Sequence, residues 1–218
     1  MNNSILNFEI ISGTDTSIYA NIKRYLINFE NCLISGGSSL NFYLDRLNLD
    51  KEKINIDYYL TDERVSLKNS NLKNILYRTN STISVFPNYN FNNYNELDYF
   101  SYLINYFKKK QSFIKVAILG FGDDGHIFSL FDRSNLTIIK KYKNYFLIKK
   151  KYEDYYRLSF NLDILNNLKK IFIVINSKKK LKLIENILKN NDIDNTLPLA
   201  KLFKLKPKEI ILVRLNFV

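Results

Sequence analysis

The sequence predicts an α/β fold in which a mostly parallel β-sheet is covered on both faces by helices. Three observations predict it. Short apolar segments alternate along the chain with longer segments of helical spacing. These apolar segments are continuous rather than alternating with polar residues, as in strands that are buried on both faces. Glycine-containing loops follow two of them, where the carboxyl ends of parallel strands would meet.

Five helices are expected where apolar residues recur at intervals of three and four. In residues 15–30, Ile18, Ile22, Leu26 and Phe29 fall on one side of such a helix. The last turn of the helix expected at 95–110 carries lysines, which suits the helix dipole. The remaining three are expected from the glycine pair 36–37 through Asn48, at 71–79 and at 177–190.

Strands are expected where apolar, β-branched and aromatic residues form short runs. Two of these runs, 145–150 and 155–160, look like a pair that adds antiparallel strands to the parallel core. The chain shows no linker, internal repeat or low-complexity segment, so we expect one domain over residues 1–218. The other strands are expected at 32–35, 54–60, 83–86, 114–120, 170–176 and 208–214.

The composition fits a globular protein of a reducing compartment. Hydrophobic residues make up 46% of the 218-residue chain, enough for a sizeable core. No apolar run approaches the ~18 residues that span a bilayer, and the N-terminal segment lacks the basic region and cleavage site of a signal peptide. The single cysteine, Cys32, excludes an internal disulfide framework. We expect a cytoplasmic protein with no membrane contact.

The formal net charge of +12 raises the question of a nucleic-acid partner. Lysines are spread over the chain in short runs, and the chain is rich in residues that A/T-rich codons encode. No RNA-recognition motif, zinc knuckle or basic leucine-zipper pattern accompanies them. We therefore interpret the charge as compositional and expect no nucleic-acid partner, although a positive field would attract an anionic substrate.

Five of the six glycines lie in two short stretches, each after an apolar run. The first stretch, "SGGSS" at 35–39, stands between a strand and a helix. Backbone N–H groups, serine hydroxyls and a helix N-terminus at such a turn form an anion site, although Gly-Gly-Ser also makes ordinary turns. The stretch is neither a Walker A loop nor the GxGxxG dinucleotide fingerprint.

The second stretch, "GFGDDGH" at 120–126, contains the only histidine of the chain. Gly125 leaves His126 uncrowded in a loop, which favours an exposed functional imidazole over a structural one. A neutral imidazole is suited to deprotonate an attacking water near neutral pH. Asp123 or Asp124 would orient the imidazole, and a carboxylate there would favour the protonated form once the proton is taken.

A third candidate, "TDERV" at 61–65, places two carboxylates beside an arginine at a strand end. Arg64 or loop N–H groups would stabilise an oxyanion. The alternative is a helix N-cap with a salt-bridged surface arginine. One histidine and one cysteine do not make a zinc site of the usual composition, so we expect neither a metal nor a cofactor.

These pieces together resemble the 6-phosphogluconolactonases. "SGGSS", "TDERV" with "NSN" downstream, "LGFGDDGHIFSLF", and "YRLSF" followed by "IFIVINSKKK" occur in that family's order and spacing, from about residue 30 to the last strand. The resemblance implies a three-layer α/β/α fold with a Rossmann-like sheet, shared with the glucosamine-6-phosphate deaminases. It also implies hydrolysis of 6-phospho-D-glucono-1,5-lactone to 6-phospho-D-gluconate in the oxidative pentose phosphate pathway; we expect a monomer or homodimer.

The resemblance also implies roles for single residues. His126 would be the catalytic residue, with Arg64 at the substrate. Asp124 is the third candidate catalytic residue, named from its place beside the histidine, with Asp123 as the alternative. Arg157, which precedes the Leu-Ser of "YRLSF", and Lys179, which follows the strand at 170–176, are implied to lie near the phosphate. The substrate-binding residues expected in total are Ser35, Gly36, Gly37, Ser38, Asp62, Arg157 and Lys179.

Several positions depart from the family's pattern. Ile127-Phe128 replaces Thr-Ala after the histidine, and Asp132 replaces Pro. Ser39-Leu40 replaces Thr-Pro after the first loop, and "LPLAKLF" at 197–203 replaces an LPAS-like stretch. These last two changes touch loops on the expected phosphate side, so they bear on substrate affinity more than on catalytic identity.

Three other functions stay open. A deaminase of the same fold would carry Asp-Glu-Tyr where this chain has Asp62-Glu63-Arg64, and Asn-Glu-Pro where it has Ser129-Leu130-Phe131. A non-catalytic sugar-phosphate-binding regulator would keep the phosphate loop but dispense with the histidine, and would usually carry a DNA-binding segment. A nucleic-acid-binding protein is supported by net charge alone. The sequence favours the lactonase over each of them.

Overall fold

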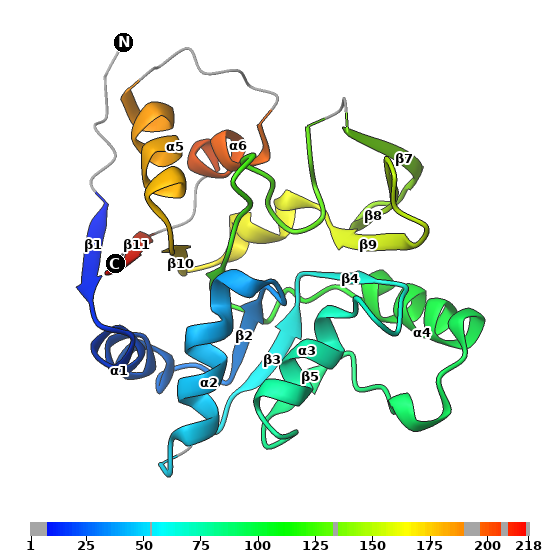
Figure 1. The fold of residues 1–218 in the computed structure, drawn as a ribbon, viewed down its shortest axis with the longest axis horizontal. Helices are drawn as coiled ribbons and strands as arrows, with labels where there is room; N and C mark the ends of the chain where they lie inside the picture. The colour runs from blue at the N-terminus through cyan, green and yellow to red at the C-terminus, as the bar shows by residue number, and fades with distance from the viewer. Residues whose placement is uncertain (1–7, 53, 133–134, 190–196, 206–208, 217–218) are drawn as a thin grey trace.

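A seven-stranded sheet forms the centre of the computed structural model, which describes residues 8–52, 54–132, 135–189, 197–205 and 209–216 (Figure 1). Its strands are β1 (Glu9–Gly13), β2 (Asn31–Ile34), β3 (Asp57–Leu60), β5 (Ser84–Phe86), β6 (Val116–Leu119), β10 (Lys170–Ile175) and β11 (Ile210–Leu215). They lie in the order β1-β11-β10-β6-β2-β3-β5, and each neighbouring pair is parallel. The predicted parallel sheet is therefore confirmed.

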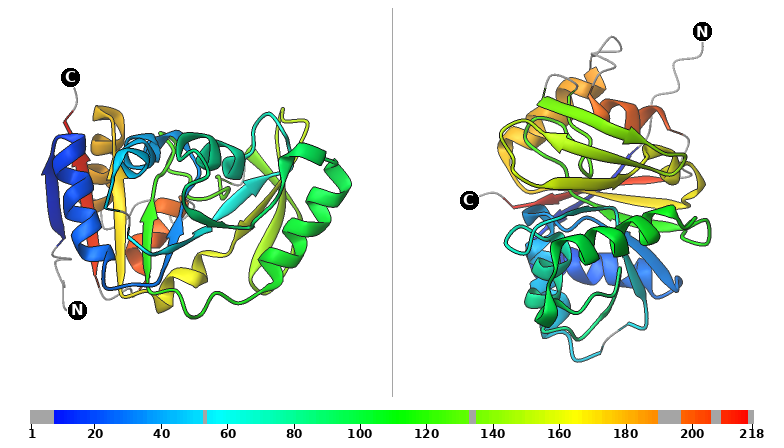
Figure 2. Two further views of the ribbon diagram at one scale, coloured as in Figure 1. Left: turned by 90° about the horizontal axis from the view of Figure 1, so that it is seen from below. Right: turned by 90° about the vertical axis from the view of Figure 1, so that its right-hand side faces the viewer.

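Helices cover both faces of this sheet and complete the three-layer α/β/α arrangement (Figure 2). One face is covered by α1 (Asp15–Leu26), α2 (Asn41–Leu49) and α3 (Asn71–Arg78). The other is covered by α4 (Glu96–Lys108), α5 (Lys178–Lys189) and α6 (Pro198–Lys204). Their inward residues recur at helical spacing, as Ile18, Ile22 and Leu26 do in α1.

Polar caps fix where three of these helices begin. The side chains of Thr14, Ser70 and Asn95 accept backbone N–H groups from the first turns of α1, α3 and α4. These N–H groups have no carbonyl partner within their own helix, so each cap stabilises the start of its helix. The short 3₁₀ turn Ser38–Leu40 begins within the first glycine stretch and leads directly into α2.

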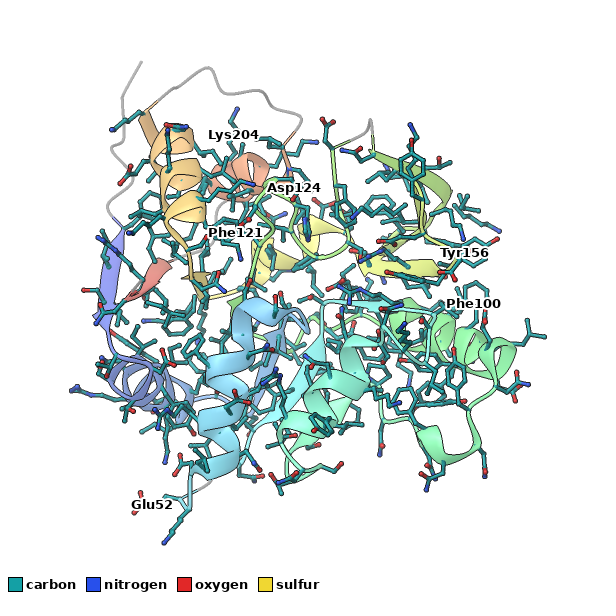
Figure 3. The ribbon with its side chains drawn as sticks, in the orientation of Figure 1. Glu52, Phe100, Phe121, Asp124, Tyr156 and Lys204 are labelled. Atoms are coloured by element: carbon teal, nitrogen blue, oxygen red, sulfur yellow. The ribbon has the colours of Figure 1, made fainter. Side chains whose placement is uncertain are left out.

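The strands expected at 145–150 and 155–160 are antiparallel partners, as predicted, but they belong to a second sheet and not to the parallel one. This sheet has the order β4 (Asp62–Arg64), β9 (Tyr156–Phe160), β8 (Tyr145–Lys150) and β7 (Leu136–Lys141). Thr61 alone separates β3 from β4, so the chain passes there from one sheet into the other. α4 packs against the second sheet, where the rings of Phe100 and Tyr156 lie 6.1 Å apart (Figure 3).

Some boundaries and elements differ from those expected. The helix expected at 15–30 ends at Leu26, and the strand expected at 54–60 begins at Asp57. The sequence did not predict β1, β4, β7 or α6. Most residues of β1 and β7 are exposed or half-exposed, so these strands lack the continuous apolar run by which the other strands were predicted. Other expectations fall on residues that lie outside the described ones, namely 1–7, Asn190 and Lys208. Among the described helices, none combines the length and apolarity needed to cross a bilayer.

Candidate active site

The predicted loops meet at the carboxyl ends of β2, β3 and β6, where a cleft of about 310 Å³ opens. Ligands of open parallel sheets bind at this edge. The cleft is lined by six of the residues expected from the sequence: Ser35, Gly37, Ser38, Asp62, Arg64 and His126. The other expected residues lie around it, with Gly36 in an adjoining hollow and Asp124, Arg157 and Lys179 outside the lining.

The loop after β6 wraps tightly around the histidine, and its glycines make this possible. A Cβ atom on Gly122 would lie 2.0 Å from Nδ1 of His126 and 2.4 Å from Oδ1 of Asp124, so any larger residue would displace these side chains or the loop. Gly125 has a φ of +77°, which side-chain-bearing residues rarely adopt. The Gly122 N–H donates to the carbonyl of His126 over 2.9 Å, which closes the loop. Figure 3 labels Phe121 and Asp124 on this segment.

His126 and Asp124 form a paired imidazole and carboxylate. Nδ1 of His126 lies 2.5 Å from Oδ1 of Asp124. Because an ionised carboxylate accepts only, we assign the proton of the neutral ring to Nδ1, which leaves the Nε2 lone pair as a base. The hydrogen bond with His126 lowers the pKa of Asp124 to about 2, so this carboxylate is ionised at neutral pH. Asp123 instead lies 3.7 Å from Nζ of Lys179, so of the two aspartates Asp124 is the one that contacts the imidazole.

The glycine-serine loop approaches its neighbours closely. A Cβ atom on Gly36 would lie 2.3 Å from Cβ of Asn71, and one on Gly120 would lie 2.6 Å from Cβ of Ser39. The buried atoms Oγ of Ser35 and Oδ1 of Asn71 have no hydrogen-bond partner within the described residues, and both residues line the cleft. Buried polar atoms without a partner are costly, so these two are available to a polar ligand.

Lys180, which the sequence analysis missed, lines the cleft in place of the expected Lys179. Its Nζ donates to Oγ of Ser39 over 2.7 Å and to Oδ1 of Asn176 over 2.8 Å, and burial lowers its pKa. Lys179 points outward, with 71% of its side chain exposed. The periodicity of α5 contained the signal, because Lys180 falls on the same helix face as Ile184 and Ile187.

In the "TDERV" segment, Glu63 has a structural role and does not line the cleft. It is fully buried and accepts the backbone N–H groups of Arg64, Asn71 and Leu72 over 2.6–2.7 Å, so it holds the start of α3. Burial raises the pKa of Glu63 to about 7, while these N–H groups act in the opposite direction. The helix-capping alternative therefore fits Glu63. Arg64 lines the cleft instead, with Nη1 donating to the carbonyl of Asn69 and a buried Nε without a partner in the described chain.

Asp62 is held from behind the cleft by a buried polar chain. Its Oδ2 accepts from Oγ of Ser129 over 2.7 Å and from Nδ2 of Asn71 over 3.2 Å. Arg157 lies one step further away, where its Nη1 donates to Oγ of Ser129 over 3.3 Å. The guanidinium also makes two hydrogen bonds to Glu153, over 2.6 and 2.7 Å. Arg157 thus stands behind Asp62 rather than on the cleft wall.

The family model for glucosamine-6-phosphate isomerases and 6-phosphogluconolactonases matches residues 22–211. The chain belongs to this family. The match includes the whole second sheet, the strands of the central sheet from β2 to the start of β11, and every candidate residue described above. A search of curated protein sequences finds no significant match. Among the described residues, no cluster of three or more histidine, cysteine or acidic side chains is arranged to hold a metal ion.

Solved structures similar to this family member share its fold at low sequence identity. A 6-phosphogluconolactonase from Shewanella baltica is 16% identical, with a TM-score of 0.71 over 97% of this chain and 99% of that chain. One from Leishmania guyanensis is 14% identical, with a TM-score of 0.72 over 96% and 97%. One from Thermotoga maritima is 20% identical, with a TM-score of 0.67 over 97% and 100%.

Proposed function

We propose that this protein hydrolyses 6-phospho-D-glucono-1,5-lactone to 6-phospho-D-gluconate, in the oxidative pentose phosphate pathway of the cytoplasm. The observation that carries the proposal is the His126–Asp124 pair at a cleft that Arg64 and Lys180 also line. Family membership and the 6-phosphogluconolactonases of the same fold support it. The substrate is small and anionic, and the reaction uses water alone, so the proposal includes no cofactor.

In the proposed mechanism, His126 is the general base. Its Nε2 takes a proton from a water molecule whose oxygen attacks C1 of the lactone, and the carbonyl oxygen becomes an oxyanion. The C1–ring-oxygen bond then breaks, and the imidazolium returns the proton to the departing oxygen, which becomes a hydroxyl. Asp124 stabilises the imidazolium between these steps. Such a base contributes about 10²–10⁴-fold, which suits a δ-lactone, an activated ester that already hydrolyses in water.

The remaining cleft residues divide between the lactone and the phosphate. Arg64 is proposed to stabilise the oxyanion, and Asp62 to accept hydroxyl groups of the sugar ring. The loop at 35–38 supplies backbone N–H groups and serine hydroxyls at the start of a helical turn, which favours an anion. Lys180 supplies a cation beside this loop. We therefore assign the phosphate to this side of the cleft.

The runner-up function is that of a glucosamine-6-phosphate deaminase, since the family includes both reactions. Arg64 stands where that reaction's enzymes prefer tyrosine, and it lines the cleft. Ser129, where they carry asparagine, is fully buried and donates to Asp62. A non-catalytic sugar-phosphate-binding protein would have no use for the His126–Asp124 pair. All three observations favour the lactonase.

The test is a lactonase assay on freshly generated 6-phosphogluconolactone, with spontaneous hydrolysis subtracted. A parallel assay with glucosamine 6-phosphate measures ammonia release. We expect enzyme-dependent lactone hydrolysis and no ammonia. Ammonia release without lactone hydrolysis would establish the deaminase instead, and activity in neither assay together with binding of 6-phosphogluconate would establish the non-catalytic protein.

A further inference from the structure

Arg157 is buried beside Ser129 and Phe131, each of which contacts a residue of the candidate site. It lies on β9, is 4% exposed, and reaches Ser129 with one side-chain nitrogen and the ring of Phe131 with its guanidinium plane. Ser129 holds Asp62, and Phe131 packs on His126. We propose that Arg157 is a positioning residue that fixes both Asp62 and His126 without touching the substrate. Its kinetic consequences rest on the proposed function, whereas its structural consequences do not.

The guanidinium itself is immobilised by Glu153. Two parallel hydrogen bonds, from Nε and Nη2 of Arg157 to the two carboxylate oxygens of Glu153, are 2.7 and 2.6 Å long. This paired geometry fixes the plane of the guanidinium as well as its place. Nη2 also donates to the hydroxyl of Tyr155 over 3.3 Å. The guanidinium of Arg157 is therefore held in one orientation, in a buried position beside the cleft.

The first connection runs through Ser129 to Asp62. The Oγ of Ser129 accepts a hydrogen bond from Nη1 of Arg157 over 3.3 Å. A hydroxyl has a single hydrogen to donate, and here it is directed to Oδ2 of Asp62 over 2.7 Å. Ser129 is completely buried, so no water replaces either partner. The Arg157 contact thus selects the hydroxyl orientation that holds the Asp62 carboxylate.

The second connection runs through Phe131 to His126. The guanidinium carbon of Arg157 lies 5.2 Å from the centre of the Phe131 ring, within the range of a cation–π contact. Nζ of Lys150 lies 4.3 Å from the same ring centre. The Phe131 ring in turn lies 4.3 Å from the imidazole of His126, centre to centre. Phe131 is thus packed between cations and the imidazole, and it limits the orientations that His126 adopts.

Direct phosphate binding by Arg157 fits this geometry poorly. Four of its five N–H groups are directed to Glu153, Ser129 and Tyr155. The residue is not part of the cleft lining. A direct phosphate ligand would act on the phosphorylated substrate alone, whereas a positioning residue acts on any lactone in the cleft. The two roles therefore differ in a measurable way.

The experiment compares three variants on phosphorylated and unphosphorylated gluconolactone. Arg157→Met removes the positioning group, and Ser129→Ala breaks the connection to Asp62 while leaving the Arg157–Glu153 pair intact. Arg78→Met is the control, because Arg78 also pairs with a carboxylate, that of Asp45, but through Nη1 alone and outside the cleft. We expect kcat/KM to fall about 10- to 100-fold for the first two variants, the loss for a hydrogen bond to a charged group, by the same factor on both lactones.

A second readout is independent of catalysis. His126 is the only histidine, so its Cε1–H signal in a tag-free protein is unique in an NMR spectrum. We expect Arg157→Met to shift this signal, because the Phe131 ring that packs on His126 loses one of its supports, and Arg78→Met to leave it unchanged. Inactive wild-type protein would refute the proposed function while this readout still tests the positioning role. A loss confined to the phosphorylated lactone, or an unshifted His126 signal in Arg157→Met, would overturn the proposal.

Discussion

Nζ of Lys180 donates to Oγ of Ser39 over 2.7 Å and so joins the start of α5 to the glycine-serine loop after β2. The two residues are 141 positions apart in the chain. The contact brings a cation to a loop rich in N–H groups, at the edge where β2 and β10 end. The cleft therefore has a cationic side, to which we assign the phosphate.

Lys180→Met should impair binding of the phosphorylated lactone. We expect KM to rise about 10- to 100-fold, because the variant would lose the proposed hydrogen bond between the Lys180 ammonium and the substrate phosphate, which are both charged. Lys179→Met is the matched control because this neighbour is exposed and lies outside the cleft lining, and its KM should stay near that of wild type. Because burial lowers the pKa of Lys180, wild-type affinity should also decline as the pH rises through that lowered value. Equal KM values for the two variants would place the phosphate elsewhere.

Gly122→Ala should disturb His126 directly. The added Cβ would lie 2.0 Å from Nδ1 of His126, so the loop must shift, at a cost of about 1–3 kcal/mol in the free energy of unfolding. We expect a lower melting temperature, a shifted His126 NMR signal and a reduced kcat. Gly37→Ala is the control for the melting temperature and the His126 signal, because a Cβ at Gly37 has no heavy atom within 4 Å; its kcat is not compared, since Gly37 lies in the proposed phosphate loop. A wild-type His126 signal in Gly122→Ala would show that the loop does not hold the imidazole in this way.

Asp124→Asn should lower kcat about 10- to 100-fold, the effect of losing a charge-assisted hydrogen bond. The folded-state pKa of Asp124, about 2, lies below its ordinary value of 3.8. Its contribution to stability is therefore fully present above pH 3.8 and is lost as the pH falls through about 2. Thermal unfolding between pH 2 and 5 should show a smaller dependence on pH in the variant. Asp123→Asn, which removes a carboxylate that contacts Lys179 and not the imidazole, should keep the wild-type dependence of unfolding on pH.

The net charge of +12 should not create a specific nucleic-acid site. We expect weak binding to duplex DNA that is insensitive to sequence and falls steeply with salt, as for any phosphate-driven contact. Titration of labelled duplexes at two salt concentrations measures this. Sequence-selective, nanomolar binding at physiological salt would require a second function for the chain.

The sequence was most informative where buried apolar runs and helical spacing coincide. β6 and β10 bury nearly every residue, and α1 buries residues at helical spacing, so periodicity predicts them. β7 exposes nearly all of its residues and is held by its pairing with β8, which no local pattern reveals. For the same reason, the sequence predicted an antiparallel pair but not its separation into a second sheet.

For the site, the motifs located the loops but not the direction of each side chain. Gly122 and Gly125 indicated a loop shaped around His126, and the structure gives both glycines a steric reason. The choice between Lys179 and Lys180 depends on how α5 rotates against the sheet, so a motif position alone misses it. The place of Arg157 depends on Glu153, a partner that the family resemblance does not include.

His126→Ala decides whether the imidazole is the base. We measure kcat on freshly generated 6-phosphogluconolactone, with spontaneous hydrolysis subtracted, and confirm by circular dichroism and thermal unfolding that the variant is folded. The proposal predicts a folded protein whose kcat is reduced about 100-fold or more, the contribution of a positioned general base. A folded variant that keeps near-wild-type kcat would contradict it.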